Sequence, residues 1–401
     1  MPLPSLSPEQ RIKPPHFELR ISLIFAAIFV PQAVHLPYFP LWLEANGFGA
    51  QEIAVILSAP MFLRVVTTPF VTAMADEAND RANVLILLVA SALLVSLGFF
   101  LRPTYLVVLA VSLALAAAWT PHSPLADSLA LSGVRRFGSN YTRMRIWGSI
   151  AFLCGNLGGG LILSLTSEKS VPAIISCGLV VTLLVSFLAP RLGRPRKASP
   201  LSAVEIQDAA PKLLNRYFVL FVAGAGVITG SHAFLYSFVS IYWKSIGIGD
   251  TTVGLLWAWA VVAEVFMFLF FNRLFSRRSA TALLALAGVG AILRWLAFPL
   301  IWPSGIGIIG FFAVQSLHSF STALILIGVQ KLIVETVPEE RTGAAQGIAF
   351  FANGFSMATF TLASGPLYAA FGVNGFFPMI AVAVFGMGLV WMAHRSTPKV
   401  W

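Results

Sequence analysis

Five charged side chains interrupt the long apolar runs of this sequence, and they are the first candidates for chemistry. They are Arg64, Asp127, Arg145, Glu264 and Arg294. At the centre of a membrane-spanning helix a charged residue costs roughly 2.5–3.5 kcal/mol on insertion scales, so it seldom faces lipid. Each of the five therefore predicts either a functional group or one member of an ion pair that holds helices together.

Glu264 stands near the middle of GLLWAWAVVAEVFMFLFF, residues 254–271, where every other residue is apolar or glycine. Helical spacing places it on one face with Trp257, Val261 and Phe268. Burial of a carboxyl group among such side chains favours its neutral, protonated form. We therefore expect Glu264 to hold a proton near neutral pH.

His318 is a second candidate for proton chemistry, because imidazole titrates nearest to neutral pH. One helical face of its run carries Gln315, His318, Ser319 and Thr322. The alternative is a structural, neutral His318 bonded to a carbonyl group. Arg294 has three candidate partners: Glu264, His318, or the lipid headgroups, which an arginine near a span end can reach.

Asp127 and Arg145 form a candidate pair in the first half of the chain. A guanidinium group presents a planar fork that grips a carboxylate with two hydrogen bonds, so Arg145 is a candidate for binding a carboxylate. The helical face of Arg145 also carries Ser149, Phe152 and Asn156. Arg64 has two candidate partners, Asp127 and Asp76, and the sequence does not choose between them.

The composition indicates which elements hold these residues. Of the 401 residues, 58% are hydrophobic and 10% charged, and the mean hydropathy is +0.84. Soluble domains carry about 25% charged residues, so the chain is predicted to be an integral membrane protein. The net charge of +10 does not indicate nucleic-acid binding, because the basic residues gather in loops between apolar runs. Cys154 and Cys177 lie inside apolar runs, so we expect neither a disulfide nor a metal site.

Twelve runs are near the length of about 20 residues that a helix needs to cross a bilayer. They are 18–43, 51–75, 83–101, 104–132, 142–165, 171–189, 213–243, 251–272, 280–301, 306–333, 342–370 and 373–394. The longest polar interruption lies between the sixth and seventh runs. The predicted organisation is an N-terminal segment 1–17, a six-helix bundle 18–189, a linker 190–212, a six-helix bundle 213–394 and a tail 395–401.

The lysine and arginine residues predict the orientation of these runs. With both termini in the cytoplasm, twenty of the twenty-six basic residues fall in cytoplasmic segments and three on the opposite side. Basic residues are concentrated in the cytoplasmic loops of membrane proteins. The distribution therefore favours cytoplasmic termini and an even number of spans.

An internal repeat relates the two halves. LWLEANGFGAQEIAVILSAP begins at residue 41 and IYWKSIGIGDTTVGLLWAWA at residue 241, so that Gly47 matches Gly247 and Arg64 matches Glu264. Parallel repeats of six spans are typical of secondary transporters, in which the substrate site lies near the bilayer midplane.

Particular stretches carry a resemblance to a known family. They are PLADSLAL (124–131), YTRMRIWGSIAF (141–152), GSHAFLYSFVSIYW (230–243), GLLWAWAVVAEV (254–265), LRW (293–295) and QSLHS (315–319). Through them the whole chain resembles the major facilitator superfamily, and within it the 3-phenylpropionate permeases, which are relatives of lactose permease and other oligosaccharide/proton symporters. The resemblance implies an all-α fold of twelve transmembrane helices in two six-helix bundles.

The same resemblance implies a function and roles for residues. It implies proton-coupled uptake of a small organic solute, such as the aromatic carboxylate 3-phenylpropionate, by rocking of one bundle against the other. Glu264, His318 and Asp127 are then expected to serve proton coupling. Substrate binding is expected of Arg145, Asp127, Arg294, Gln32, His35, His232, Tyr236 and Asn353. The tenth span of lactose permease also carries a Lys and a Glu, which this sequence lacks, so its proton route cannot be copied wholesale.

The loop between the second and third spans departs from the superfamily's signature. Residues 72–83 read TAMADEANDRAN, in which Asp76 and Arg81 remain but the glycines are missing. We expect Arg64, Asp76 and Arg81 to form charge pairs or to take part in gating.

Other functions remain open at this point. They are a sugar or nucleoside proton symporter, an exporter of the same fold and a membrane receptor without transport. An enzyme would need clustered His, Asp or Cys, and ATP-driven transport would need a nucleotide motif, neither of which is found. We expect no cofactor, a monomer, and a location in the inner (plasma) membrane.

Overall fold

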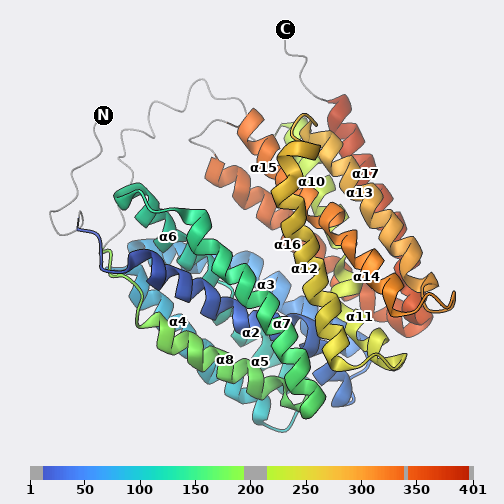
Figure 1. Cartoon of the computed structure of the whole chain (residues 1–401), viewed down its shortest axis with the longest axis horizontal. Helices are drawn as coiled ribbons and strands as arrows, with labels where there is room; N and C mark the ends of the chain where they lie inside the picture. Colours follow the sequence, from blue (N-terminus) through green and yellow to red (C-terminus); the bar gives the residue numbers. More distant parts are fainter. Residues whose placement is uncertain (1–11, 194–214, 338–341, 397–401) are drawn as a thin grey trace. The chain divides into compact units, whose positions relative to one another are not determined.

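The described part of the chain is built from helices. In the computed structural model, residues 12–193, 215–337 and 342–396 are described, and these contain no strand (Figure 1). Eleven helical stretches are long and apolar enough to cross a membrane. The last, Ala344–Arg395, spans two helices on either side of the turn Gly372–Gly375, so each of the twelve predicted runs is helical. The predicted all-α membrane fold is confirmed.

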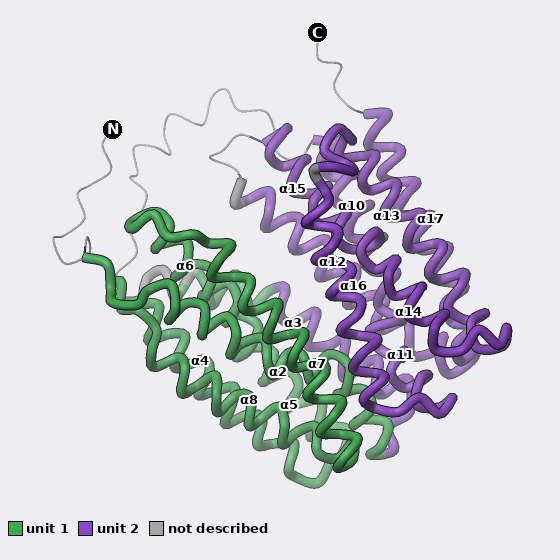
Figure 2. Tube along the Cα trace, in the orientation of Figure 1, with its two compact units in different colours: residues 1–46, 66–197 green, residues 47–65, 198–401 purple. Residues whose placement is uncertain are grey.

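The chain forms two compact units, which Figure 2 colours separately. The first unit comprises residues 1–46 and 66–197, and the second comprises residues 47–65 and 198–401. Most of the predicted linker 190–212 lies outside the described residues. The predicted bundles, 18–189 and 213–394, would place all of 51–75 in the first half, and that assignment stays a prediction.

The first unit is organised around its first helix. Its helices are α2 (Phe17–Ala45), the second part of α3 (Ala50–Glu77), α4 (Arg81–Ser96), α5 (Tyr105–Trp119), α6 (His122–Phe137), α7 (Tyr141–Leu165) and α8 (Val171–Ser186). Helix α2 packs along α7 and α8. Fully buried apolar side chains such as Phe17, Phe25 and Leu85 form the core between these helices. This packing brings the candidate residues of α7 against α2.

The second unit contains the remaining helices. They are α10 (Arg216–Gly230), α11 (Ala233–Ser245), α12 (Asp250–Leu274), α13 (Ala280–Ala297), α14 (Ile308–Ser316), α15 (Leu324–Thr336), α16 (Thr342–Phe371) and α17 (Phe376–Arg395). Residues 47–65 of α3 join them by packing on α16, where the Phe62 and Phe355 rings lie 5.7 Å apart.

The two turns of the predicted repeat have the same backbone conformation. Helices α2 and α11 end at Ala45 and Ser245, and the next helices begin at Ala50 and Asp250. Gly47 and Gly247 have φ of 84° and 86°, a left-handed conformation that glycine adopts without steric cost. The offset of 200 residues therefore corresponds to a repeated backbone structure, which supports the alignment of Arg64 with Glu264.

Three of the predicted spans are not continuous α-helices. The fourth is interrupted at Thr120 and Pro121, between α5 and α6. The seventh is interrupted at Ser231 and His232, between α10 and α11. The tenth contains a π-helical turn, Ser319–Ala323, between α14 and α15. π turns are rare, and they frequently occur at functional sites.

Candidate functional site

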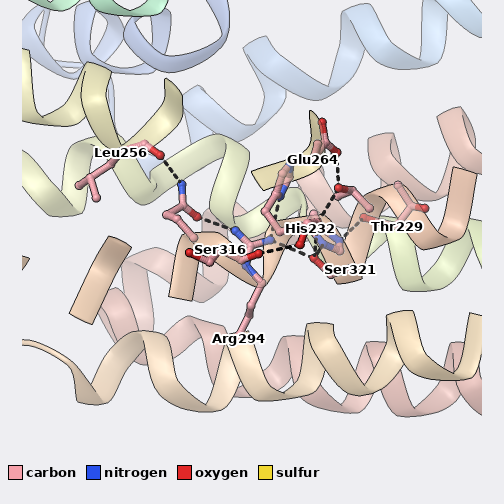
Figure 3. A network of polar contacts seen from close by, with 11 residues as sticks. Thr229, His232, Leu256, Glu264, Arg294, Ser316 and Ser321 are labelled. Atoms are coloured by element: carbon pink, nitrogen blue, oxygen red, sulfur yellow. Dashed lines mark hydrogen bonds and ion pairs between the residues drawn. The ribbon is translucent and has the colours of Figure 1, made fainter. Parts of the chain in front are cut away.

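A buried polar network lies within the second unit. It joins the α10–α11 break, α12, α13 and the segment from α14 through the π turn, as Figure 3 shows. Several members were predicted from the sequence, namely His232, Glu264, Arg294 and His318. The structure brings all four of them into one connected set of contacts.

Arg294 is the centre of this network. Its side chain is fully buried, and it donates from Nη1 to Nδ1 of His318 at 3.0 Å and to Oγ of Ser321 at 3.2 Å. From Nη2 it donates to Oε1 of Gln315 at 2.6 Å. Of its three predicted partners, the structure shows His318. A fully buried arginine does not reach lipid headgroups.

The bond from Arg294 fixes the tautomer of His318. A guanidinium group has donors and no acceptor, so Nδ1 of His318 must accept and carries no hydrogen. The hydrogen of the neutral imidazole therefore sits on Nε2, which lies 3.6 Å from Oε1 of Glu264. A proton can enter Nδ1 only if Arg294 first gives up this hydrogen bond.

Thr322 connects Glu264 to the same helix. Its hydroxyl group bonds to Oε1 of Glu264 and lies 2.6 Å from the carbonyl oxygen of His318. A hydroxyl group owns one hydrogen and two acceptor lone pairs. It can donate to an ionised Glu264, or it can donate to the carbonyl while a protonated Glu264 donates to it. The arrangement thus accommodates both protonation states of Glu264 without moving a heavy atom.

The surroundings of Glu264 differ from the predicted aromatic face. Trp257 is buried and stacks on Tyr236 at 5.8 Å, but Phe268 is 46% exposed. The nearest partners of the carboxyl group are polar, His318 and Thr322. The prediction assumed a carboxyl group among aromatic rings, and it failed in this respect because helical spacing describes only one helix.

Sequence analysis missed Ser321 and did not recognise the full role of Gln315. Ser321 accepts from Arg294 and lies 2.9 Å from Nε2 of His232, so its hydroxyl group links two predicted residues. Gln315 accepts from Arg294 and donates to the carbonyl oxygen of Leu256 at 3.2 Å. Regular spacing favoured Ser319, whose hydroxyl group instead bonds to a backbone carbonyl. Ser321 follows His318 by three residues, so regular helical spacing could have grouped the two.

His232 and Tyr236 border the network. Nδ1 of His232 lies 3.2 and 3.1 Å from the carbonyl oxygens of Ile228 and Thr229. At the break between α10 and α11 these two oxygens accept from the backbone N–H groups of Ser231 and His232, three residues further on. The ring of Tyr236 stacks on His232 at 6.4 Å and on Trp257. Both residues therefore contact the site, and their predicted role in substrate binding stays a prediction.

A second polar site lies within the first unit. Asp127 on α6 accepts a hydrogen bond of 2.8 Å from the hydroxyl group of Tyr141, at the start of α7. The same oxygen, Oδ1, lies 4.0 Å from Nε of Arg145. That distance is longer than the 2.7–2.9 Å of a charged hydrogen bond, so the predicted pair is loose. The sequence contained Tyr141 one helical turn before Arg145, but its link to Asp127 depends on how α6 and α7 pack.

Aromatic rings hold Arg145 from the other side. Its guanidinium carbon lies 4.4 Å from the ring centre of Phe29 and 5.3 Å from that of Phe25, both on α2. Gly148 makes room for this arrangement, since a Cβ there would lie 2.8 Å from Nη1 of Arg145 and 3.0 Å from Phe29. The arrangement offers a half-exposed cation beside two phenyl rings.

The remaining predicted residues are less closely engaged. Gln32 and Asn353 are exposed. His35 stacks on Phe39 at 4.5 Å and meets Trp119 edge-on at 5.4 Å, which is packing within the first unit. Their predicted roles in binding stay predictions.

Arg64, Asp76 and Arg81 were predicted for charge pairing or gating. The buried Nε of Arg64 has no hydrogen-bond partner among the described residues. The side chain of Asp76 lies outside the described residues, so the partner of Arg64 stays a prediction. Arg81 begins α4 and donates to Oγ of Ser132 at 3.4 Å.

Known proteins resemble this chain along most of its length. The "Probable 3-phenylpropionic acid transporter" of Escherichia coli (strain K12) is 26% identical over 376 residues, which are 92% of this chain and 96% of the relative. Maltose permease of Geobacillus stearothermophilus is 28% identical over 292 residues, which are 72% of this chain and 71% of the relative. The crystal structure of the nucleoside transporter NupG superposes with a TM-score of 0.77 at 14% identity, covering 96% of this chain and all of that chain.

The sequence profile of the MFS_1 like family provides the assignment. It matches residues 19–379, from the start of α2 into α17. The structural likeness to NupG agrees with the fold of this family. The chain therefore belongs to the MFS_1 like family, and it is a membrane transporter and not an enzyme.

Proposed function

We propose that this transporter takes up a small aromatic carboxylate, such as 3-phenylpropionate, together with protons, by alternating access. The observation that carries the proposal is the site of Arg145. It combines a half-exposed guanidinium group with the rings of Phe25 and Phe29. Its carboxylate partner, Asp127, lies 4.0 Å away, which is too far for a hydrogen bond. The curated relative named for 3-phenylpropionic acid supports the choice of substrate.

A carboxylate that carries an aryl ring matches both features of this site. The guanidinium fork binds a carboxylate with two parallel hydrogen bonds, which are charge-assisted and directional. Phenyl rings beside the fork offer an apolar surface and edge-to-face contacts for the aryl group of the substrate. A sugar has no negative charge, so it would gain less than a carboxylate from the positive charge and the paired donors of the Arg145 guanidinium group.

The second unit is proposed to carry the coupled proton. Glu264 is the candidate acid, because Thr322 can satisfy its carboxyl group in either protonation state. His318 is the neighbouring base, and its Nε2 faces Glu264. Loss of the proton from Glu264 creates a negative charge beside the guanidinium group of Arg294, which bonds to His318. Arg294 would then exchange His318 for the ionised Glu264. The energetic link between proton and substrate would act through this change of partner.

The setting in the membrane is part of the same proposal. The surplus of basic residues in alternate loops supports a plasma-membrane protein with both termini in the cytoplasm. Two bundles, 18–189 and 213–394, would rock against each other around the substrate. We propose a monomer as the working unit.

A sugar or nucleoside symporter is the second candidate. Maltose permease and NupG are among the relatives and structural neighbours, and this favours keeping the alternative. The two candidates differ in how they would use Arg145. A carboxylate would take two parallel charged hydrogen bonds from the guanidinium fork, whereas a neutral hydroxyl group would take a weaker bond that a lysine can also donate.

Uptake by proteoliposomes tests the proposal. Purified protein is reconstituted, and uptake of labelled 3-phenylpropionate is measured with and without an inward proton gradient. We expect accumulation driven by the gradient in the wild type and its loss in Glu264→Gln, which keeps the shape and removes the titratable group. Glu335→Gln is the matched control, because Glu335 is an exposed acid of the second unit whose partner is Lys331.

The possible outcomes of the uptake measurement test the substrate and the coupling acid separately. No uptake by the wild type would remove the aromatic carboxylate, and maltose and nucleosides would then be tested on the same vesicles. Full accumulation by Glu264→Gln would remove Glu264 as the coupling acid. Retained exchange of substrate in Glu264→Gln, without accumulation, would support a role in coupling alone.

A further inference from the structure

Tyr141 lies between the two charges of the first unit and has no role in the function proposed so far. Its hydroxyl group donates to Oδ1 of Asp127 at 2.8 Å. This is the same oxygen that lies 4.0 Å from Nε of Arg145. The acid therefore bonds to a neutral phenol while a full cation stands just beyond hydrogen-bonding distance.

The position of the Tyr141 hydroxyl group is fixed by packing. The ring of Tyr141 meets the ring of Phe25 edge-on at 6.3 Å, and Phe25 is fully buried. Because Tyr141 and Arg145 are one turn apart on α7, a single helix face presents both groups to Asp127. The phenol thus holds Asp127 from a rigid support.

Asp127 and a substrate carboxylate would compete for the same guanidinium group. An arginine fork that closes on an internal carboxylate forms short charged bonds and is no longer open to an incoming anion. Gly148 and Phe29 already confine the guanidinium group on other sides. Movement of Asp127 toward Arg145 would bring its carboxylate into hydrogen-bonding distance of the guanidinium group, where it would compete with the substrate.

We propose that Tyr141 is a positioning residue that restrains Asp127 and so keeps Arg145 available to the carboxylate of the substrate. The inference rests on the proposed function, in which Arg145 binds that carboxylate. It assigns a specificity role to a phenol whose hydroxyl group bonds to Asp127 beside the guanidinium group of Arg145.

The test combines transport with a chemical measurement that needs no substrate. In Tyr141→Phe the ring stays and the hydroxyl group is lost. We expect the KM for 3-phenylpropionate to rise roughly tenfold with little change in kcat, the size of effect that one hydrogen bond to a charged group produces. The double variant Tyr141→Phe with Asp127→Asn should return to within about twofold of Asp127→Asn alone, since the competing charge is gone.

Labelling of Arg145 by an arginine-selective glyoxal, read by peptide mass spectrometry on the full-length protein, follows the fork directly. We expect slower labelling in Tyr141→Phe and recovery in the double variant. Tyr105→Phe, in the same unit at the start of α5, is the matched control and should label as the wild type does.

Two results would overturn the inference. Unchanged or faster labelling of Arg145 in Tyr141→Phe would show that the phenol does not restrain Asp127. A raised KM that persists in the double variant would assign Tyr141 to direct substrate contact or to packing. If the wild type does not transport 3-phenylpropionate at all, the proposed substrate fails, while the labelling still reports whether Tyr141 separates the two charges.

Discussion

The two polar sites contain similar residue types, but their arginine side chains differ in burial and in the number of close partners. In the first unit Arg145 is half-exposed, and its acid Asp127 stands 4.0 Å away and bonds to a phenol. In the second unit Arg294 is fully buried and donates to three polar side chains at 2.6–3.2 Å. Arg294 is held in place by its several close partners. Arg145, whose acidic partner Asp127 is loose, remains able to exchange that partner for another anion.

Removal of each arginine gives the largest expected difference between the sites. Arg294→Leu would leave Gln315, Ser321 and His318 buried without their donor, and each polar group left unsatisfied costs about 1–3 kcal/mol. Arg145→Leu should cost no more than about 1 kcal/mol, since exposed pairs contribute little. Unfolding of both variants in mixed micelles, titrated with SDS, compares the free energies. Equal losses of unfolding free energy in the two variants would contradict the view that Arg294 is fixed and Arg145 is exchangeable.

Replacement of the Arg145 guanidinium group by a single ammonium group tests its function in transport. Arg145→Lys keeps the charge but loses the two parallel hydrogen bonds, so we expect the KM for 3-phenylpropionate to rise roughly 30-fold, about 2 kcal/mol. Stability should remain near that of the wild type. Uptake equal to the wild type would exclude a carboxylate held by the guanidinium fork and would favour a substrate without charge.

The smallest expected effect concerns the hydroxyl group beside Glu264. Thr322→Val removes the group that serves both protonation states, and we expect proton-driven uptake to fall roughly fivefold, about 1 kcal/mol, as for the loss of one hydrogen bond. Thr322→Ser keeps the hydroxyl group and should stay close to the wild type. Thr336→Val is the control, because the Thr336 hydroxyl group bonds only to the carbonyl of Leu332. Similar losses in all three variants would assign Thr322 to helix packing.

Much of the fold was predictable because it depends on local properties of the chain. Apolar length defines a membrane helix, and the repeat near Gly47 and Gly247 marks two turns that share one backbone conformation. The candidate charges were also visible, since a charged residue within an apolar run is conspicuous. Regular helical spacing correctly grouped Gln315, His318 and Thr322, all of which belong to the observed network.

The sequence by itself thus determined the helices, their apolar lengths and the identity of the embedded charges. The tertiary structure decided which charges have close partners. Ser321 enters the network because α10 and α13 lie against the π turn, and Tyr141 reaches Asp127 because α6 lies against α7. Arg294 bonds to His318 and leaves Glu264 to Thr322 for the same reason. Distances between helices follow from packing of whole surfaces, and no spacing within one helix contains that information.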